Sequence, residues 1–145
     1  MRTVEARVRE VNWSEFETAY GPANRVGNQL IALASTDEDI ALKAASGLWE
    51  GLCHQHVYVS SAALPAVPFI IEALRNATPL LTVEILDILL GFVVCTTPPS
   101  EYREEWKQQL NAKLVEELPL FVQFVEHENE DVRHFARSAI ELLAP

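Results

Sequence analysis

The sequence predicts an all-α protein: a short α-solenoid of about three helical hairpins with an N-terminal capping helix. Apolar residues at helical spacing, broken by a polar turn, run from 118 to 143 and recur twice upstream. The repeated apolar positions are Val26, Leu30, Leu33, Ile40, Ala44 and Leu48, then Val67, Ile71, Leu74, Leu81, Ile85 and Leu89, then Leu118, Val122, Val125, Val132, Ala136 and Ile140. Chance rarely preserves such a set, even in a chain that is 49% hydrophobic. We expect one domain, residues 1–145, with repeats near 23–53, 61–95 and 113–144 and a helical insertion at 100–112.

Residues 12–20 are predicted to form the capping helix. Trp13, Phe16 and Tyr20 lie three and four residues apart on one helical face, and Gly21-Pro22 ends the helix. Because a terminal repeat needs a cover, we expect these three rings to belong to the core. Residues 1–11 are expected to form a frayed helix or a loose arm.

The first repeat is predicted to contain helices at 23–34 and 38–53, with Thr36 or Asp37 as the cap of the second helix. Trp49 lies at the edge of the apolar stripe of that helix, where it either packs against the next repeat or meets a partner. We expect His54 to end the helix by bonding its last carbonyl groups. Ser60 or Ser61 is predicted to cap the next helix.

The second repeat contains Pro65 and Pro68 in its first helix, which should therefore begin late or bend. Its second helix, residues 80–94, is apolar apart from Thr82, Glu84 and Asp87. The two carboxylates lie three residues apart and mark a single stripe. Because burying an unpaired charge is costly, that stripe must face water or a cationic group.

The insertion is predicted to be a helix that Ser100 caps and that docks through an apolar stripe. The stripe consists of Tyr102, Trp106, Leu110 and Leu114. In the third repeat, Arg133, Arg137 and Glu141 are expected to form the polar outer end of the array.

The charge balance is strongly acidic: 11 Lys+Arg against 21 Asp+Glu give a net charge of −10. Nucleic acids and anionic membranes would be repelled, so we expect a basic protein partner. Cys53 and Cys95 are interpreted as reduced core residues of a cytoplasmic protein. We expect no signal peptide and no membrane span, because the longest apolar run, Ile85–Cys95, is short and contains Asp87 and Gly91.

The sequence lacks the features that catalysis or metal binding would require. Cys53, His54 and His56 offer metal-ligand atoms, but no compact group elsewhere supplies the remaining ligands, so we expect no metal and no cofactor. There is no Gly-x-Ser-x-Gly element and, with five glycines, no phosphate-binding loop. Glu84 and Asp87 could act as a paired acid and base, which keeps an enzyme as a minor alternative.

Residues 118–143 resemble a HEAT repeat. Pro119 lies near the start of the first helix, an acidic turn follows, and Asp131-Val132-Arg133 opens a second helix that carries the small residue Ala136. The middle copy repeats the proline at Pro68, whereas the first copy has Lys43 in place of the arginine. Some HEAT-like proteins are DNA glycosylases, but those use basic clefts and this chain is acidic.

A second set of residues resembles small bacterial HEAT-like proteins, some of which belong to toxin-immunity loci. The residues are Trp13, Tyr20-Gly21-Pro22-Ala23, His54-Gln55, Tyr58 and Ala66-Val67-Pro68-Phe69. This resemblance implies a non-catalytic immunity protein that binds and neutralises a basic toxin such as a nuclease. The alternative is an adaptor or assembly scaffold for a housekeeping protein.

In HEAT-like arrays the second helices line the concave side, and this resemblance implies the binding face. Glu84 and Asp87 would lie at its centre, flanked by Lys43 and Glu50. The other candidate partner-binding residues are Trp49, His56 and Tyr58. We expect a monomer or a weak dimer.

Overall fold

The fold was analysed in a computed structural model, which describes residues 2–101 and 103–144. The elements in chain order are α1 (Val4–Arg9), η1 (Trp13–Glu15), β1 (Glu17–Thr18), β2 (Gly21–Pro22), α2 (Val26–Leu33), α3 (Glu38–Leu52), η2 (His54–His56), α4 (Ala63–Arg75), α5 (Pro79–Thr96), η3 (Pro99–Glu101), α6 (Glu105–Glu116), α7 (Leu118–Val122) and α8 (Glu130–Leu143), where η is a 3-10 turn. The described strands form one small antiparallel hairpin. The predicted all-α class is confirmed.

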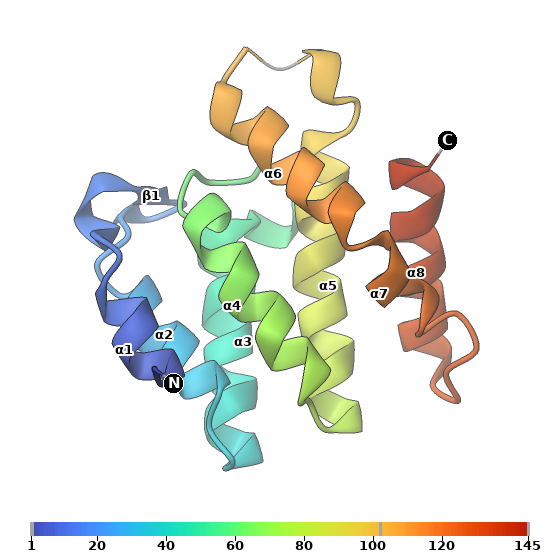
Figure 1. The fold of residues 1–145 in the computed structure, drawn as a ribbon, viewed down its shortest axis with the longest axis horizontal. Helices are drawn as coiled ribbons and strands as arrows, with labels where there is room; N and C mark the ends of the chain where they lie inside the picture. Colours follow the sequence, from blue (N-terminus) through green and yellow to red (C-terminus); the bar gives the residue numbers. More distant parts are fainter. Residues whose placement is uncertain (1, 102, 145) are drawn as a thin grey trace.

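The helices form two rows (Figure 1). In one row α3, α5 and α8 lie side by side, and α5 contacts both of its neighbours. Each of the three also packs on the helix that precedes it in the chain: α3 on α2, α5 on α4 and α8 on α7. Contacts of α1 with α2, α2 with α4, α4 with α6 and α6 with α7 link the other row.

The helix α5 lies at the centre, and its position accounts for its composition. It contacts α3, α4, α6 and α8, and Ile85, Ile88 and Leu89 are fully shielded from solvent. By length and composition alone α5 could cross a membrane, and 61% of this stretch is buried inside the protein. Burial by neighbouring helices explains the apolar run.

The helices α3, α5 and α8 begin with the same kind of cap. Asp37, Thr78 and Asn129 occupy the N-cap positions, and their side-chain oxygens accept hydrogen bonds of 2.8–3.4 Å from backbone N–H groups of the first turn. Each cap satisfies donors that a helix leaves unpaired. Of the two caps predicted for α3, Asp37 is the one used.

The other predicted caps are wrong. No side chain caps α4, which begins after Ala62. The hydroxyl of Ser61 instead accepts a hydrogen bond of 2.9 Å from the backbone N–H of Glu17, which ties the β hairpin to the start of α4. Ser100 lies in the η3 turn, and α6 begins later, at Glu105.

The predicted capping helix at 12–20 is also wrong, because these residues form a 3-10 turn followed by the β1–β2 hairpin. Gly21 has φ +111°, a conformation that breaks a helix and allows the tight reversal. Trp13 is buried as expected, and its Nε1 donates to the carbonyl of Val8 at 3.0 Å. Phe16 is partly buried, but Tyr20 is 70% exposed and is not a core residue.

The helix that closes this end is α1. Val8 is completely buried, and α1 packs on α2. The Arg7 guanidinium donates to both carboxylate oxygens of Glu72 on α4, at 2.8 and 2.9 Å. This bidentate pair holds the pKa of the Glu72 carboxyl below its ordinary value.

The insertion forms α6, which begins a few residues later than the predicted helix at 100–112. Leu110 and Leu114 are fully buried and Trp106 is partly buried, as the predicted stripe required, whereas Tyr102 lies outside the described residues. Asn111 is 6% exposed, and its Nδ2 donates to the carbonyl and hydroxyl oxygens of Thr96 at 3.2 and 3.1 Å. This contact joins α6 to the end of α5.

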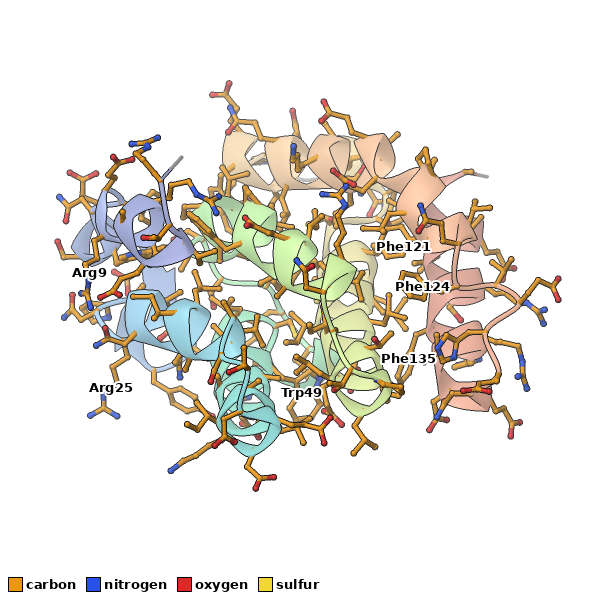
Figure 2. All side chains as sticks on the ribbon, turned by 60° about the horizontal axis from the view of Figure 1, so that its bottom comes forward. Arg9, Arg25, Trp49, Phe121, Phe124 and Phe135 are labelled. Atoms are coloured by element: carbon orange, nitrogen blue, oxygen red, sulfur yellow. The ribbon has the colours of Figure 1, made fainter. Side chains whose placement is uncertain are left out.

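The last hairpin has a very short first helix, α7. Phe121, Phe124 and Phe135 lie between α5 and this hairpin (Figure 2) and belong to the core or pack against it. Arg133 and Arg137 of α8 donate to three backbone carbonyl groups of the turn that joins α7 to α8, at 2.8–3.0 Å. Their guanidinium groups therefore hold this turn together.

Replacing Asn111 by alanine should lower the free energy of unfolding by about 1–3 kcal/mol, because the buried polar groups of Thr96 would lose a donor. The matched change Gln109→Ala, at an exposed position of the same helix, should alter stability by less than about 0.5 kcal/mol. Urea unfolding followed by circular dichroism measures both. Equal stability of the two variants would show that this contact does not anchor α6.

Candidate functional site

The segment after α3 turns sharply across α5 through η2, which contacts both helices. The backbone N–H of His56 donates to the carbonyl of Cys53 at 2.7 Å, and that of Ser60 donates to Leu52 at 2.9 Å. His54 and His56 have φ of +33° and +65°, a region that costs a non-glycine residue about 1–3 kcal/mol. Such strain clusters at functional sites, so this turn is the first candidate.

The predicted role of His54 is wrong, because its ring does not bond the last carbonyl groups of α3. Its Nδ1 is buried and has no hydrogen-bond partner within the described residues. The same holds for Nε1 of Trp49. The backbone turn, rather than the ring of His54, ends the helix.

His56 links η2 to α5. Its Nε2 lies 2.8 Å from Oδ1 of Asp87 and 2.8 Å from the backbone carbonyl of the same residue. The hydrogen bond to the carboxylate raises the pKa of His56 above its ordinary value, against a smaller opposing effect of partial burial. The ring of Trp49 lies edge-on to the ring of His56, 6.4 Å between centroids. Three predicted site residues from separate elements therefore meet here.

Gly91 permits this close approach. A Cβ atom at this position would lie 2.7 Å from Cδ2 of His56 and 2.8 Å from Sγ of Cys53. Real side-chain contacts do not come this close, so η2 can pack on α5 only because position 91 lacks a side chain.

A second group of aromatic residues lies beside this pair. The hydroxyl of Tyr20 donates to Oε2 of Glu50 at 2.9 Å, and this bond raises the pKa of Tyr20. The ring of His54 lies between two tyrosines, with centroids 6.2 Å from Tyr20 and 5.1 Å from Tyr58. Glu50 and Tyr58 thus belong to this second group, which the η2 turn connects to His56 through His54.

The remaining predicted residues differ in position. Glu84 is exposed, one turn before Asp87 on α5, and its pKa is raised by partial burial and by the charge of Asp87. Lys43 is exposed and lines a groove with Gln29 of α2 and with Arg25, the residue before α2. The structure therefore brings Trp49, His56 and Asp87 together, with Glu84 one turn before Asp87. It places Glu50 and Tyr58 in the second group, around Tyr20 and His54, and Lys43 belongs to neither group.

Cys53, His56 and Asp87 have the residue types of a cysteine catalytic triad, but their arrangement does not suit that chemistry. Cys53 is completely buried, and burial raises the pKa of its thiol to about 12. A thiolate is the nucleophile, so this thiol is inert at neutral pH. Its Sγ lies 3.4 Å from the carbonyl of Trp49. Within residues 2–101 and 103–144, no three His, Cys, Asp or Glu side chains are placed to hold a metal ion.

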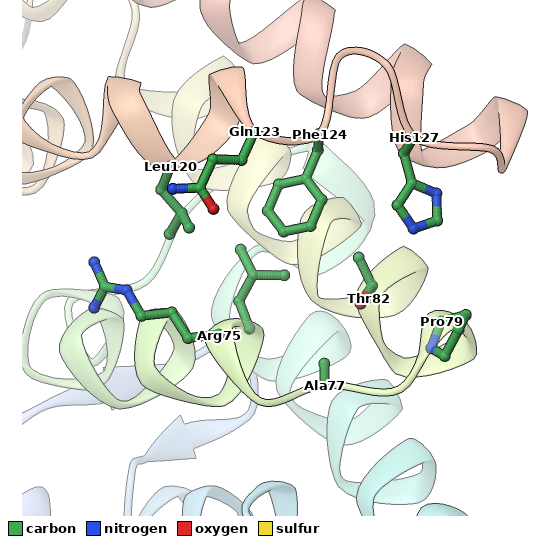
Figure 3. Close-up of a pocket in the computed structure, with 9 residues that line it drawn as sticks. Arg75, Ala77, Pro79, Thr82, Leu120, Gln123, Phe124 and His127 are labelled. Atoms are coloured by element: carbon green, nitrogen blue, oxygen red, sulfur yellow. The ribbon is translucent and has the colours of Figure 1, made fainter.

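A separate hollow of about 460 Å³ lies between the α4–α5 turn and α7 (Figure 3). Arg75 and His127 lie at its rim, and both side chains already have partners. Nη2 of Arg75 donates to Glu117 at 3.1 Å, and Nδ1 of His127 accepts from the backbone of Asn129 at 3.0 Å. None of the predicted site residues lines this hollow.

Comparison with protein families, with curated proteins and with solved structures finds no match for this chain.

Two residues of the site escaped the sequence reasoning. Tyr20 was assigned to the core because its spacing from Phe16 fits a helix, although the Tyr-Gly-Pro sequence also fits a hairpin turn. In the sequence, Gly91 stands out only as an interruption of the apolar run Ile85–Cys95. A glycine inside an otherwise apolar helix is a signal for close approach of another chain segment, and that signal was available.

Replacing Gly91 by alanine should destabilise the protein by about 1–3 kcal/mol, because the new methyl group would displace His56 and Cys53. Gly47→Ala is the matched control in α3: its Cβ would meet only the flexible end of Gln29, so better helix propensity should stabilise by up to about 1 kcal/mol. Urea unfolding measures both. Similar effects at the two positions would refute the tight packing of η2 on α5.

The contact between His56 and Asp87 should make stability depend on pH. Because the folded pKa of His56 is raised, its stabilisation is complete below the unfolded pKa near 6.5 and is lost as pH rises through the folded value. NMR titration of the imidazole should give a lower pKa for His56 in Asp87→Asn than in the wild type. At pH values above the folded pKa of His56, the difference in the free energy of unfolding between the wild type and this variant should shrink. An unchanged His56 pKa in the variant would refute the pairing.

Proposed function

We propose that the chain is a short, non-catalytic α-solenoid of the HEAT type that binds a basic protein. Three helical hairpins, α2–α3, α4–α5 and α7–α8, support the repeat architecture, because their second helices share one row and begin with equivalent caps. Such arrays use the surface of one row as an extended binding face.

The observation that carries the proposal is the grouping of carboxylates and aromatic rings around η2. Asp87 contacts His56, which lies beside Trp49, and Glu84 precedes Asp87 by one turn on α5. On the other side of the same turn, Tyr58 packs against His54, which also contacts Tyr20, the partner of Glu50. Aromatic residues are enriched in protein interfaces, and a net charge of −10 steers a basic partner toward the molecule. The turn at His54 and His56 is strained, and such strain clusters at functional sites, which supports a role in binding.

The site chemistry supports binding rather than catalysis. The Cys53 thiol, with a pKa of about 12, supplies no nucleophile, and Nε2 of His56 is already bonded to Asp87. Glu84 and Asp87 lie on the surface of α5 rather than in a closed cleft. Binding that covers this face would therefore account for the exposed carboxylates and aromatic rings without requiring a reaction.

The partner we propose is a basic toxin, such as a nuclease, which makes the chain an immunity protein. This step rests on the resemblance of the aromatic and loop residues to small bacterial HEAT-like proteins.

The tagged chain should capture one stoichiometric basic protein from the cells that encode it, and that protein should be toxic alone and harmless when co-expressed. Capture of several non-toxic housekeeping proteins would instead favour the adaptor.

Replacing Glu84 and Asp87 together by lysine should weaken capture of the partner at least about tenfold, because two attractive charges become repulsive. Glu116→Lys with Glu126→Lys is the matched control, since it changes the net charge equally at exposed positions of other segments. Calorimetry measures affinity, and circular dichroism checks that each variant is folded. Equal losses in both variants would show that only the overall charge matters.

A further inference from the structure

The tip of the β hairpin and the loop after η2 expose a compact apolar patch, here called the tyrosine patch. It consists of Tyr20, Val57 and Tyr58, which are 70%, 71% and 45% exposed. The ring of His54 lies between the two tyrosines and connects them. Exposed large side chains that cluster are typical of interaction sites, whereas single ones are ordinary.

Tyr20 is held in place although it is exposed. The hairpin is fastened to α3 by a hydrogen bond of 2.8 Å from the backbone N–H of Ala19 to Gly51. The backbone N–H of Tyr20 donates to Thr18 at 3.1 Å, and its hydroxyl donates to Glu50 at 2.9 Å. The ring stays largely exposed although these bonds form, so the bonds serve to fix its orientation. An interface side chain fixed beforehand loses less entropy on binding.

The chemistry of the patch fits an arginine side chain. A guanidinium stacks on tyrosine rings and at the same time donates to a carboxylate, whereas the ammonium of lysine is a compact, strongly hydrated charge. Glu50 supplies the carboxylate: Tyr20 uses one of its acceptor sites, and a carboxylate offers about four. Tyr20 and Glu50 also line a hollow of about 630 Å³ that opens beside the hairpin.

We propose that the tyrosine patch together with Glu50 is a recognition site for an arginine side chain of the basic partner. This inference rests on the proposed binding of a basic protein and adds which side chain of that partner the site recognises. Arg25 also lines the hollow, and its guanidinium projects away from the molecule (Figure 2). Its positive charge opposes a second cation, so removing it should strengthen binding.

The test uses hexa-arginine and hexa-lysine peptides, which carry equal charge, with the isotope-labelled full chain at about 0.15 M salt. Backbone NMR signals of Tyr20, Val57 and Tyr58 should shift with hexa-arginine, which should bind about three- to fivefold more tightly than hexa-lysine. The double change Tyr20→Ala with Tyr58→Ala should abolish this preference. Val122→Ala, at an exposed apolar position of α7, is the matched control and should retain it. Arg25→Gln should tighten binding of both peptides.

The outcomes separate this inference from the proposed function. Equal binding of both peptides, with shifts at Glu84 and Asp87 only, would overturn the arginine site and leave the acidic face as the binding surface. Absence of shifts with either peptide would overturn both. Because both tyrosines are exposed, the double variant should fold, and its circular dichroism spectrum verifies this. If the folded double variant kept the preference for arginine, the tyrosine patch would not be its cause.

Discussion

The structure depends on enclosing α5, whose side chains are apolar in nearly every direction. Each helix packed around it removes apolar surface from water, at about 25 cal/mol per Å². The polar groups of α5 are therefore restricted to places where a partner exists. Thr82 and Thr96 bond to carbonyl groups one turn earlier, at 2.9 and 2.7 Å. Glu84 and Asp87 lie along the strip next to η2, so the burial of α5 decides where the molecule can carry a charged face.

The turn at that face has an energetic cost. Two histidines in the left-handed region, together with buried nitrogen atoms of Trp49 and His54 that lack partners in the described part of the chain, oppose folding. The same turn packs on α5 against Gly91. Proteins accept such costs where the geometry serves recognition, and the rest of the fold must then supply the compensating stability.

The helical hairpins could be predicted because the spacing of apolar residues marks the side of each helix that is buried. Of the repeated apolar positions, Ile40 and Val122 alone are more than a third exposed, at 49% and 53%. Residues 12–20 could not be assigned in this way, since two turns of helical spacing also fit a 3-10 turn and a hairpin. The contact between His56 and Asp87 spans 31 residues and leaves no local pattern. The sequence therefore predicts that both residues belong to the site but does not predict that they contact each other.

The way in which Arg133 and Arg137 hold the last turn has a consequence for the behaviour of the molecule in solution. Both guanidinium groups bond to neutral carbonyl oxygens, and the chain keeps a net charge of −10. Copies of the chain therefore repel one another at neutral pH, which favours a dispersed, colloidally stable solution. As carboxylates take up protons in acid this repulsion fades, and copies can approach closely enough to precipitate.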